Sequence, residues 1–435
     1  MRIYGIDLGT TNSLIGLYSK KYLSDLIPSC VDINTGECGK SMFERMDAKR
    51  SFKVDMSMGK EGNLSRVASS YVLKELCKQV PEKVTDVVIS VPAYFSDNQR
   101  QATLDAAHMA GLQVHGLVNE PTAAAMYIAQ EKKSLFVVFD LGGGTFDISI
   151  IDSRFGTYDV QASSGCMIGG DDFDNNIMRY FVKQGDIKLY HLNQLEKNAL
   201  KHYASKVKIK MQKEQKSFDV TLKEWGGTDI VFTPETYIEL MKMTFNEAMQ
   251  CALKLIHAYI PEDELYEVLP VGGSTRCPYL RKWLHEELHA EVTTLTYDPD
   301  RVVAQGAAYY AHLIENESVT QKVSDVTRAL SISCADGTAD IIVEANSKIP
   351  LKVERMFYNF STSSALELAL YQGESTFVSE NEHIGTLVWE YDEVKPAMEG
   401  QVIVTISIDS KGIITFQAGE LLKEPKTLVL DRNLC

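Results

Sequence analysis

Two segments of the chain have the residue types that hold a polyphosphate. Residues 5–13 read GIDLGTTNS, and residues 139–149 read FDLGGGTFDIS. In each, an apolar stretch leads through an aspartate into a glycine- and threonine-rich turn, followed by a second strand-like stretch. Glycines let the backbone approach a phosphate closely, and successive turn N–H groups form an anion-binding concavity. Because the aspartate can hold a metal ion's water shell, the repeat predicts two related lobes with a nucleotide between them.

Three further segments complete this set of candidate site residues. Residues 116–125 (GLVNEPTAAA) bring the carboxylate of Glu120 to the junction of a loop and a helix. Residues 271–276 (VGGSTR) follow an apolar run and precede a helix. Residues 298–308 (DPDRVVAQGAA) predict a helix that has aspartate as its N-cap and proline at its first position.

The five motifs, in this order and at this spacing, resemble the DnaK-type heat-shock protein 70 chaperones of the actin/hexokinase-like ATPase superfamily. The resemblance implies an α/β actin-like ATPase, with two lobes on a duplicated ribonuclease-H-like core, followed by an all-β sandwich. The family also has a helical lid, and we expect no helical lid here because no segment of this sequence corresponds to it. It implies a nucleotide-binding ATPase domain over residues 1–314, an interdomain linker over 315–326 and a substrate-binding sandwich over 327–435.

The elements that must position the motifs show in the sequence pattern. Residues 87–91 predict a buried strand, and Ser96 with Gln99 fits the capping box of a helix that ends near Gly111. Residues 135–141 and 145–151 predict the two strands around the second glycine-rich turn. We therefore expect strands and helices to alternate through the first 314 residues.

The pattern changes after the polar stretch at 315–322. Residues 365–371 and 402–408 alternate with period two, as in half-buried strands. The second of these leads through residues 409–412 into 413–416, which predicts a β-hairpin within a sandwich.

The resemblance also implies roles for individual residues. Asp7 and Asp140 would hold magnesium through its water shell, and Glu120 and Asp147 would orient the attacking water. Potassium is a second candidate ion. The remaining implied contacts to ATP or ADP are Gly9, Thr10, Thr11 and Asn12 in the first turn, Gly142, Gly143, Gly144 and the catalytic Thr145 in the second, and Lys208, Gly272, Gly273, Ser274, Arg276 and Asp300 on the adenosine side.

Two features of the implied site leave alternatives open. Lys53 is preferred as the cation facing the γ-phosphate because residues 51–53 resemble the family's lysine segment, and Lys49 is the alternative. On the adenosine side, Ser205 and Gln212 stand where the family has glutamate and serine. We therefore expect weaker or rearranged nucleotide contacts there.

The residues that couple the two parts match the family unevenly. Pro92 and Arg100 match its interdomain switch, whereas residues 321–324 (QKVS) replace its leucine-rich linker and Gly116 replaces a basic co-chaperone contact. A J-domain co-chaperone and a nucleotide exchange factor are therefore weaker candidate partners than unfolded or extended polypeptides. Leu366 aligns with the family's hydrophobic peptide pocket.

The implied function is that of an ATP-dependent chaperone, which hydrolyses ATP and binds extended hydrophobic peptides in the β-sandwich. One alternative is a nucleotide-gated binding or scaffold protein with little hydrolysis, favoured by the altered linker. The other is a small-molecule kinase of the same superfamily, disfavoured by the β-rich C-terminal part.

Composition excludes several other classes. The 435 residues carry a net charge of −15, which argues against a nucleic-acid surface. Eight scattered cysteines without a CxxC pair, and no signal peptide or long apolar run, predict a cytoplasmic protein away from membranes, and the family default is a monomer. Residues 285–289 match the HExxH zinc pattern, but no downstream ligand motif follows, and residues 34–41 lack the first glycine of a P-loop.

Overall fold

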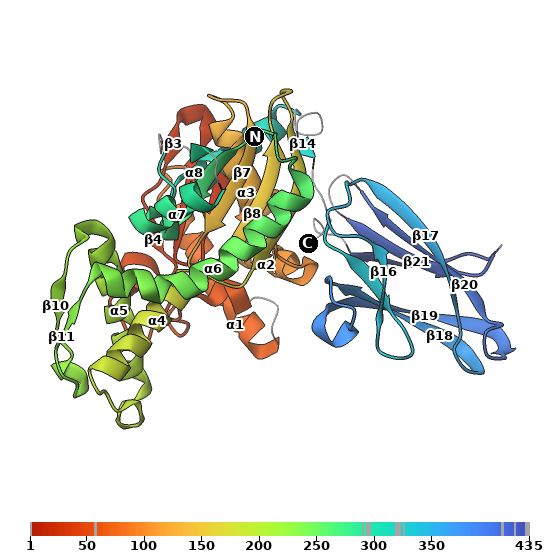
Figure 1. Cartoon of the computed structure of the whole chain (residues 1–435). Helices are drawn as coiled ribbons and strands as arrows, with labels where there is room; N and C mark the ends of the chain where they lie inside the picture. The colour runs from red at the N-terminus through yellow and green to blue at the C-terminus, as the bar shows by residue number, and fades with distance from the viewer. Residues whose placement is uncertain are drawn as a thin grey trace.

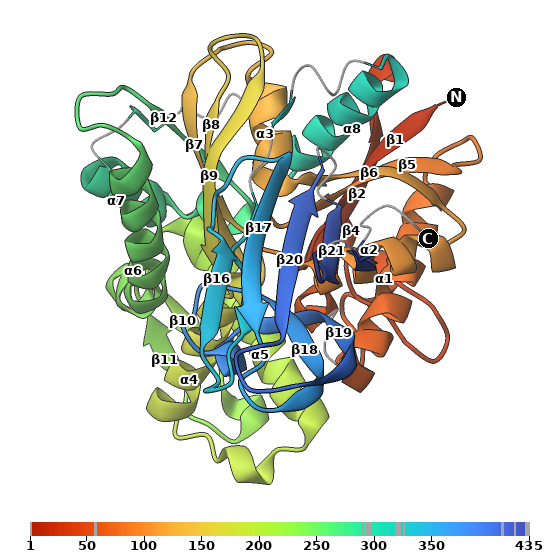
Figure 2. The same cartoon turned by 90° about the vertical axis from the view of Figure 1, so that its right-hand side faces the viewer.

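The computed structural model of the chain describes residues 2–55, 59–288, 291–292, 297–317, 323–324, 327–409, 413–421 and 423–430. Two α/β halves follow one another along the chain, and an all-β part lies to one side of them (Figure 1). Figure 2 shows the strands of the all-β part in front of both halves. Among the described residues, no helix has the length and apolar character needed to cross a bilayer.

The first half contains a mixed sheet with the strand order β3–β2–β1–β5–β6, and β4 pairs with β2. β1 runs antiparallel to β2 and parallel to β5, which in turn runs parallel to β6. The strands are β1 (Ile3–Leu8), β2 (Asn12–Leu17), β3 (Tyr22–Leu23), β4 (Ile27–Pro28), β5 (Asp86–Val91) and β6 (Gln113–Asn119), and the helices are α1 (Gly59–Lys78), α2 (Asp97–Met109) and α3 (Glu120–Ile128).

The second half repeats this arrangement with the order β13–β12–β7–β8–β9, extended by β14. β7 runs antiparallel to β8 and parallel to β12, as β1 does to β2 and β5. Its elements are β7 (Leu135–Leu141), β8 (Phe146–Asp152), β9 (Tyr158–Cys166), α4 (Gly170–Gln184), α5 (Gln194–Glu214), β10 (Phe218–Val220), β11 (Ile230–Phe232), α6 (Pro234–Tyr259), β12 (Glu267–Val271), α7 (Pro278–Leu288), β13 (Glu291–Val292), α8 (Val302–Glu315) and β14 (Val323–Ser324). The predicted duplication is present in the strand order.

The two halves exchange helices. α3 follows the last strand of the first sheet but packs on β7 and β8, while α8 comes from the second half and packs on β1, β2 and β5. The two helices also pack against each other, and one buried apolar cluster combines Val88 of the first sheet with Phe136 of the second. This shared core holds the halves together behind the candidate site.

The all-β part is a sandwich of two antiparallel sheets, with the orders β16–β15–β18–β19 and β17–β20–β21–β22. Its core combines both sheets, as Leu368 of one and Phe416 of the other show. The strands are β15 (Leu330–Ser333), β16 (Ala339–Val343), β17 (Leu351–Tyr358), β18 (Ser363–Gln372), β19 (Glu382–Lys395), β20 (Gln401–Ile408), β21 (Ile414–Gly419) and β22 (Lys426–Leu430).

Several local predictions are confirmed. The capping box is formed: the Gln99 N–H donates to Ser96 Oγ at 3.3 Å, and the Ser96 N–H donates to Gln99 Oε1 at 3.0 Å. The strands predicted at 135–141 and 402–408 are β7 and β20, and β20 pairs with β21 as the expected hairpin. The α/β part followed by a β-sandwich is as expected; the domain boundaries and the absence of a helical lid stay predictions.

The predicted start of the last α/β helix is wrong. α8 begins at Val302, because residues 298–301 form a turn in which the Arg301 N–H donates to the Asp298 carbonyl. The Asp298 carboxylate accepts from the Asp300 N–H at 3.0 Å and pairs with Arg276, so it closes this turn, and Arg301 is the N-cap residue of α8.

The expected linker includes β14, which pairs in parallel with β9. Residues 318–322 and 325–326 of that linker, 410–412 of the hairpin turn and 289 of the zinc pattern lie outside the described residues.

Replacing Gly306 with alanine should destabilise the contact between the halves. A Cβ on Gly306 would lie 1.8 Å from the Ala123 carbonyl oxygen, so α8 and α3 would have to separate. We expect a loss of about 2 kcal/mol in the free energy of unfolding, measured by denaturant titration. Gly116→Ala is the control, because its Cβ would meet side-chain atoms of Ile314 and Tyr310 at 3.4 Å. Equal stability of the two variants would contradict the prediction.

Candidate functional site

A cavity of about 480 Å³ lies between the two α/β halves. Both glycine-rich turns line it, together with α5, the segment after β12 and the start of α8. The predicted residues that line it are Asp7, Gly9, Thr10, Thr11, Asn12, Glu120, Asp140, Gly142, Gly143, Thr145, Lys208, Gly272, Gly273, Ser274, Arg276 and Asp300. The fold therefore brings residues from all five motifs to one place. Lys53, Gly144 and Asp147 are not in the lining.

The two glycine-rich turns touch each other. A Cβ on Gly143 would lie 2.0 Å from Thr11 Oγ1, so only glycine fits at this point of the second turn. The carbonyl group of Gly142 accepts hydrogen bonds from the Gly170 N–H at 2.9 Å and from Ser274 Oγ at 2.9 Å. These bonds fix the second turn to the start of α4 and to the segment after β12, both within the second half.

Four carboxyl groups and one ammonium group meet where the turns end. Burial, followed by the charge of Glu120, raises the pKa of Asp7 to about 7. Burial and Glu120 likewise raise the pKa of Asp147 to about 7, and they hold that of Asp140 well above its usual range. In their ionised forms the four carboxylates repel one another, and Lys53 offsets only part of that repulsion. Oxygen donors with surplus negative charge suit Mg²⁺, so these residues fit the expected ion.

Lys53 is the lysine that reaches this cluster. It lies in a 3₁₀ turn over Phe52–Asp55, its Nζ is 2.6 Å from Glu120 Oε1, and its side chain is only 2% exposed. Lys49 is more exposed and lies 4.0 Å from Asp55 Oδ2. The choice of Lys53 stays a prediction, and this placement favours it.

Asp147 is held from one side only. The Tyr94 N–H donates to its Oδ1 at 2.8 Å. Its Oδ2 is buried and has no hydrogen-bond partner among the described residues. A buried carboxylate oxygen without a partner is costly, and a bound water would satisfy it.

The adenosine side contains a residue that the sequence analysis missed. Lys208 Nζ lies 2.8 Å from Asp174 Oδ1 and 3.0 Å from the Gly170 carbonyl oxygen. Asp174 and the altered positions Ser205 and Gln212 also line the cavity. In the sequence, Asp174 follows two glycines, at 169 and 170, in a helix start that contains three aspartates. Only the packing of α4 on α5 shows which of these aspartates faces Lys208.

Arg276 is tied to two aspartates beside the same part of the cavity. Its Nε lies 2.6 Å from Asp300 Oδ2, and its Nη2 pairs with Asp298. These two ion pairs fix the guanidinium group of Arg276 beside the turn that also contains Gly273.

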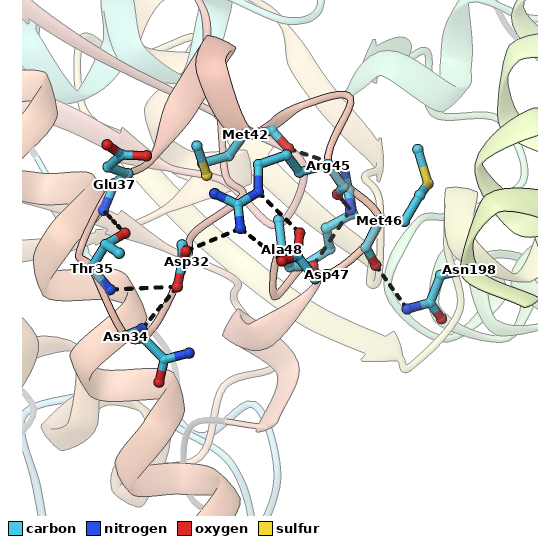
Figure 3. Close-up of polar contacts among 11 residues, drawn as sticks. Asp32, Asn34, Thr35, Glu37, Met42, Arg45, Met46, Asp47, Ala48 and Asn198 are labelled. Carbon is cyan, nitrogen blue, oxygen red and sulfur yellow. Dashed lines mark hydrogen bonds and ion pairs between the residues drawn. The ribbon is translucent and has the colours of Figure 1, made fainter. Parts of the chain in front are cut away.

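A segment over residues 42–48 of the first half reaches α5 of the second half (Figure 3). The Arg45 guanidinium group lies 2.7 Å from the Asp47 carboxylate within the segment and 3.2 Å from the Asp32 carboxylate outside it. These ion pairs stabilise the conformation of the segment. From α5, Asn198 Nδ2 donates to the Met46 carbonyl at 2.9 Å, and Lys206 Nζ lies 2.7 Å from Glu44 Oε2.

Volume alone does not identify the site. A larger hollow of about 900 Å³ lies at the end of α6, lined by apolar and acidic residues such as Leu253 and Glu287. None of the predicted site residues lines it. Of the zinc pattern, His285 is exposed on α7, and residue 289 lies outside the described residues.

The raised pKa of Asp147 predicts a pH-dependent effect of Asp147→Asn. Its folded pKa lies above the unfolded value, so ionisation between about pH 4 and pH 7 costs folding free energy as the pH rises. The variant should therefore gain stability relative to the parent at pH 8 and gain less at pH 5, measured by thermal unfolding without nucleotide or metal.

Asp152→Asn, on the same strand, is the matched control. Burial opposes ionisation there too, but hydrogen bonds from Arg154 bring the pKa of Asp152 below its usual value. This variant should lose stability at pH 8. If both variants change stability in the same direction, the assigned cause is wrong.

Comparison with known proteins agrees with this geometry. The family model described as Hsp70 protein matches residues 42–429. Chaperone protein DnaK of Mycoplasma mobile is 30% identical, covering 96% of this chain and 76% of the relative. Those of Mycoplasmoides gallisepticum and Ureaplasma parvum are 31% identical, covering 96% and 98% of this chain and 78% and 77% of the relatives. The family match extends over most of the chain, so the chain belongs to the Hsp70 family of chaperone proteins.

Proposed function

We propose that this Hsp70-family chain is an ATP-dependent molecular chaperone. An ATPase domain over residues 1–314 binds and hydrolyses ATP, a linker spans 315–326, and the sandwich over 327–435 binds extended hydrophobic segments of unfolded proteins. The observation that carries the proposal is the cavity between the halves, where both glycine-rich turns meet the buried carboxylate cluster.

The residues of the cluster divide the chemistry between them. Asp7 and Asp140 would hold magnesium through its water shell, and that ion neutralises charge on the phosphates. Glu120 and Asp147 orient the attacking water, the latter through its unpartnered Oδ2. Lys53, bound to Glu120, supplies positive charge toward the γ-phosphate. Thr145 and the glycines of the second turn hold the phosphate chain in place.

Exposed apolar side chains on the sandwich support peptide binding. Phe360 is 77% exposed, and Met356, Tyr358 and Val388 are also exposed. Leu366 packs against the sandwich core and is only partly exposed. An extended peptide would add its backbone hydrogen bonds to these apolar contacts.

Contacts between the sandwich and the ATPase part support coupling. The Asp97 N–H donates to Gln372 Oε1, and Gln372 Nε2 donates to Asp97 Oδ2, both at 3.0 Å. Arg328 lies 4.6 Å from the ring centroid of Tyr94, whose N–H holds Asp147. A change around Asp147 can therefore reach the sandwich through one residue. Stimulation by a J-domain protein, nucleotide exchange factors and a cytoplasmic location stay predictions.

Removal of the catalytic groups should abolish hydrolysis. We expect Asp147→Ala and Lys53→Ala each to lower the single-turnover rate of ATP hydrolysis by roughly 100-fold or more, since each removes a group that acts on the transferred phosphoryl or its water. Lys49→Ala is the control and should keep nearly the parent rate. The reverse pattern for the two lysines would show that Lys49 faces the γ-phosphate.

Loss of the contact between the parts should uncouple them. Gln372→Ala removes both hydrogen bonds to Asp97 and should abolish stimulation of hydrolysis by a hydrophobic extended peptide while the unstimulated rate remains. Asn98→Ala, which removes a more exposed bond to Glu382, should retain most of the stimulation. If the parent protein itself hydrolyses ATP at a rate indifferent to peptide, the scaffold function is favoured instead.

A further inference from the structure

Two cysteines from different elements meet beside the candidate site. Cys166 is the last residue of β9, and Cys251 lies on α6, which packs against β9. Ser164 Oγ lies 3.4 Å from Cys251 Sγ, and Cys166, two residues further along β9, has its side chain on the same face of the strand as Ser164. The side chains of Cys166 and Cys251 both border the apolar core of the second half, and neither residue is fully buried. Two neighbouring thiols that are not fully buried can be joined by oxidation.

The surroundings make the two thiols unequal. The hydrogen bond from Cys166 lowers the pKa of Cys251 to about 6 against the effect of burial, and Ser164 and Lys254 act in the same direction. Glu374, from the sandwich, opposes them weakly. The hydrogen bond to Cys251, burial, and the charges of Cys251, Glu247 and Asp147 raise the pKa of Cys166. Cys251 is therefore the thiolate and Cys166 the proton donor.

Three other cysteines have the opposite character. Burial raises the pKa of Cys30 and Cys77 to about 11 and that of Cys38 to about 12. Because the thiolate is the reactive form, these three thiols are poor nucleophiles near neutral pH.

We propose that Cys166 and Cys251 form a modification site that hydroperoxides oxidise to an intramolecular disulfide. The Cys251 thiolate attacks one oxygen of hydrogen peroxide, the O–O bond breaks, and Cys251 becomes a sulfenic acid as hydroxide leaves. The Cys166 sulfur then attacks the Cys251 sulfur, and its proton leaves with the sulfenic hydroxyl as water. With the proton that Cys251 had released, the hydroxide forms a second water, so two thiols and one peroxide give one disulfide and two waters.

The disulfide would tie α6 to β9 at a sensitive point. Gly165, next to Cys166, pairs with Asp147 across the β8–β9 ladder. A Cβ on Gly165 would lie 3.0 Å from Tyr94 Cβ, so this end of β9 packs closely on the residue that holds Asp147. Ser164 and Glu374 line one small cavity of about 30 Å³ where the sandwich meets the ATPase part. The neighbours of Cys166 along β9 therefore contact both the strand that carries Asp147 and the cavity between the parts.

The test uses the full chain and needs no nucleotide. The reduced protein is treated with hydrogen peroxide, and its cysteines are mapped by mass spectrometry without reduction. We expect a peptide pair linked through Cys166 and Cys251 before Cys77 is modified, and its loss on treatment with dithiothreitol. In the reduced protein at pH 7, iodoacetamide should label Cys251 roughly 50-fold faster than Cys77, with the thiolate fraction partly offset by lower nucleophilicity.

Variants assign the two roles. In Cys166→Ser, the Cys251 sulfenic acid should persist and be trapped by dimedone, whereas Cys77→Ser should form the disulfide as the parent does. Circular dichroism checks that the variants are folded. If a variant does not fold, the labelling rates of Cys251 and Cys77 in the unsubstituted protein still test the proposal. Absence of the linked peptide pair, or equal labelling rates of Cys251 and Cys77, would overturn the proposal.

Discussion

The burial of four carboxyl groups between the two halves is the constraint on which the rest of the structure depends. Asp7, Glu120, Asp140 and Asp147 come from different strands and helices, and each raises the cost of ionising its neighbours. Such a cluster persists only if the surrounding fold holds it in place. The shared apolar core behind it and the contact between the two glycine-rich turns do this, and Lys53 offsets part of the charge.

Two sets of contacts extend from the carboxylate cluster toward the sandwich. Asp147 is held by the backbone of Tyr94, and the ring of Tyr94 lies beneath Arg328 at the start of the sandwich. Arg100 adds a parallel contact, since its Nη2 donates to Asn119 Oδ1 at 2.6 Å, next to Glu120. Both sets of contacts start at or next to a carboxylate of the cluster, so the packing around Asp147 and Glu120 also bears on the face that meets the sandwich.

The sequence predicted the parts of the site that depend on local chemistry. Glycine-rich turns after a strand and aspartate, and the Ser96 capping box, are written in residues that are close together in the chain. The start of α8 was mispredicted because the backbone after Asp298 first forms a turn, and the α-helix begins only at Val302. The pairing of Lys208 with Asp174 and the bridge from residues 42–48 to α5 arise only when helices from distant segments pack together. No local pattern could have shown them.

The exchange of α3 and α8 between the halves has a mechanical consequence. A Cβ on Gly5 would lie 2.0 Å from the backbone nitrogen of Ala308, and one on Gly306 would lie 1.8 Å from the Ala123 carbonyl oxygen. Backbone therefore lies directly on backbone at these two points, without side chains that could rearrange to let the surfaces slide. Contacts of this kind oppose sliding of α8 over β1 and α3, so a movement that opened the cleft would have to turn around α8 and not shear across it.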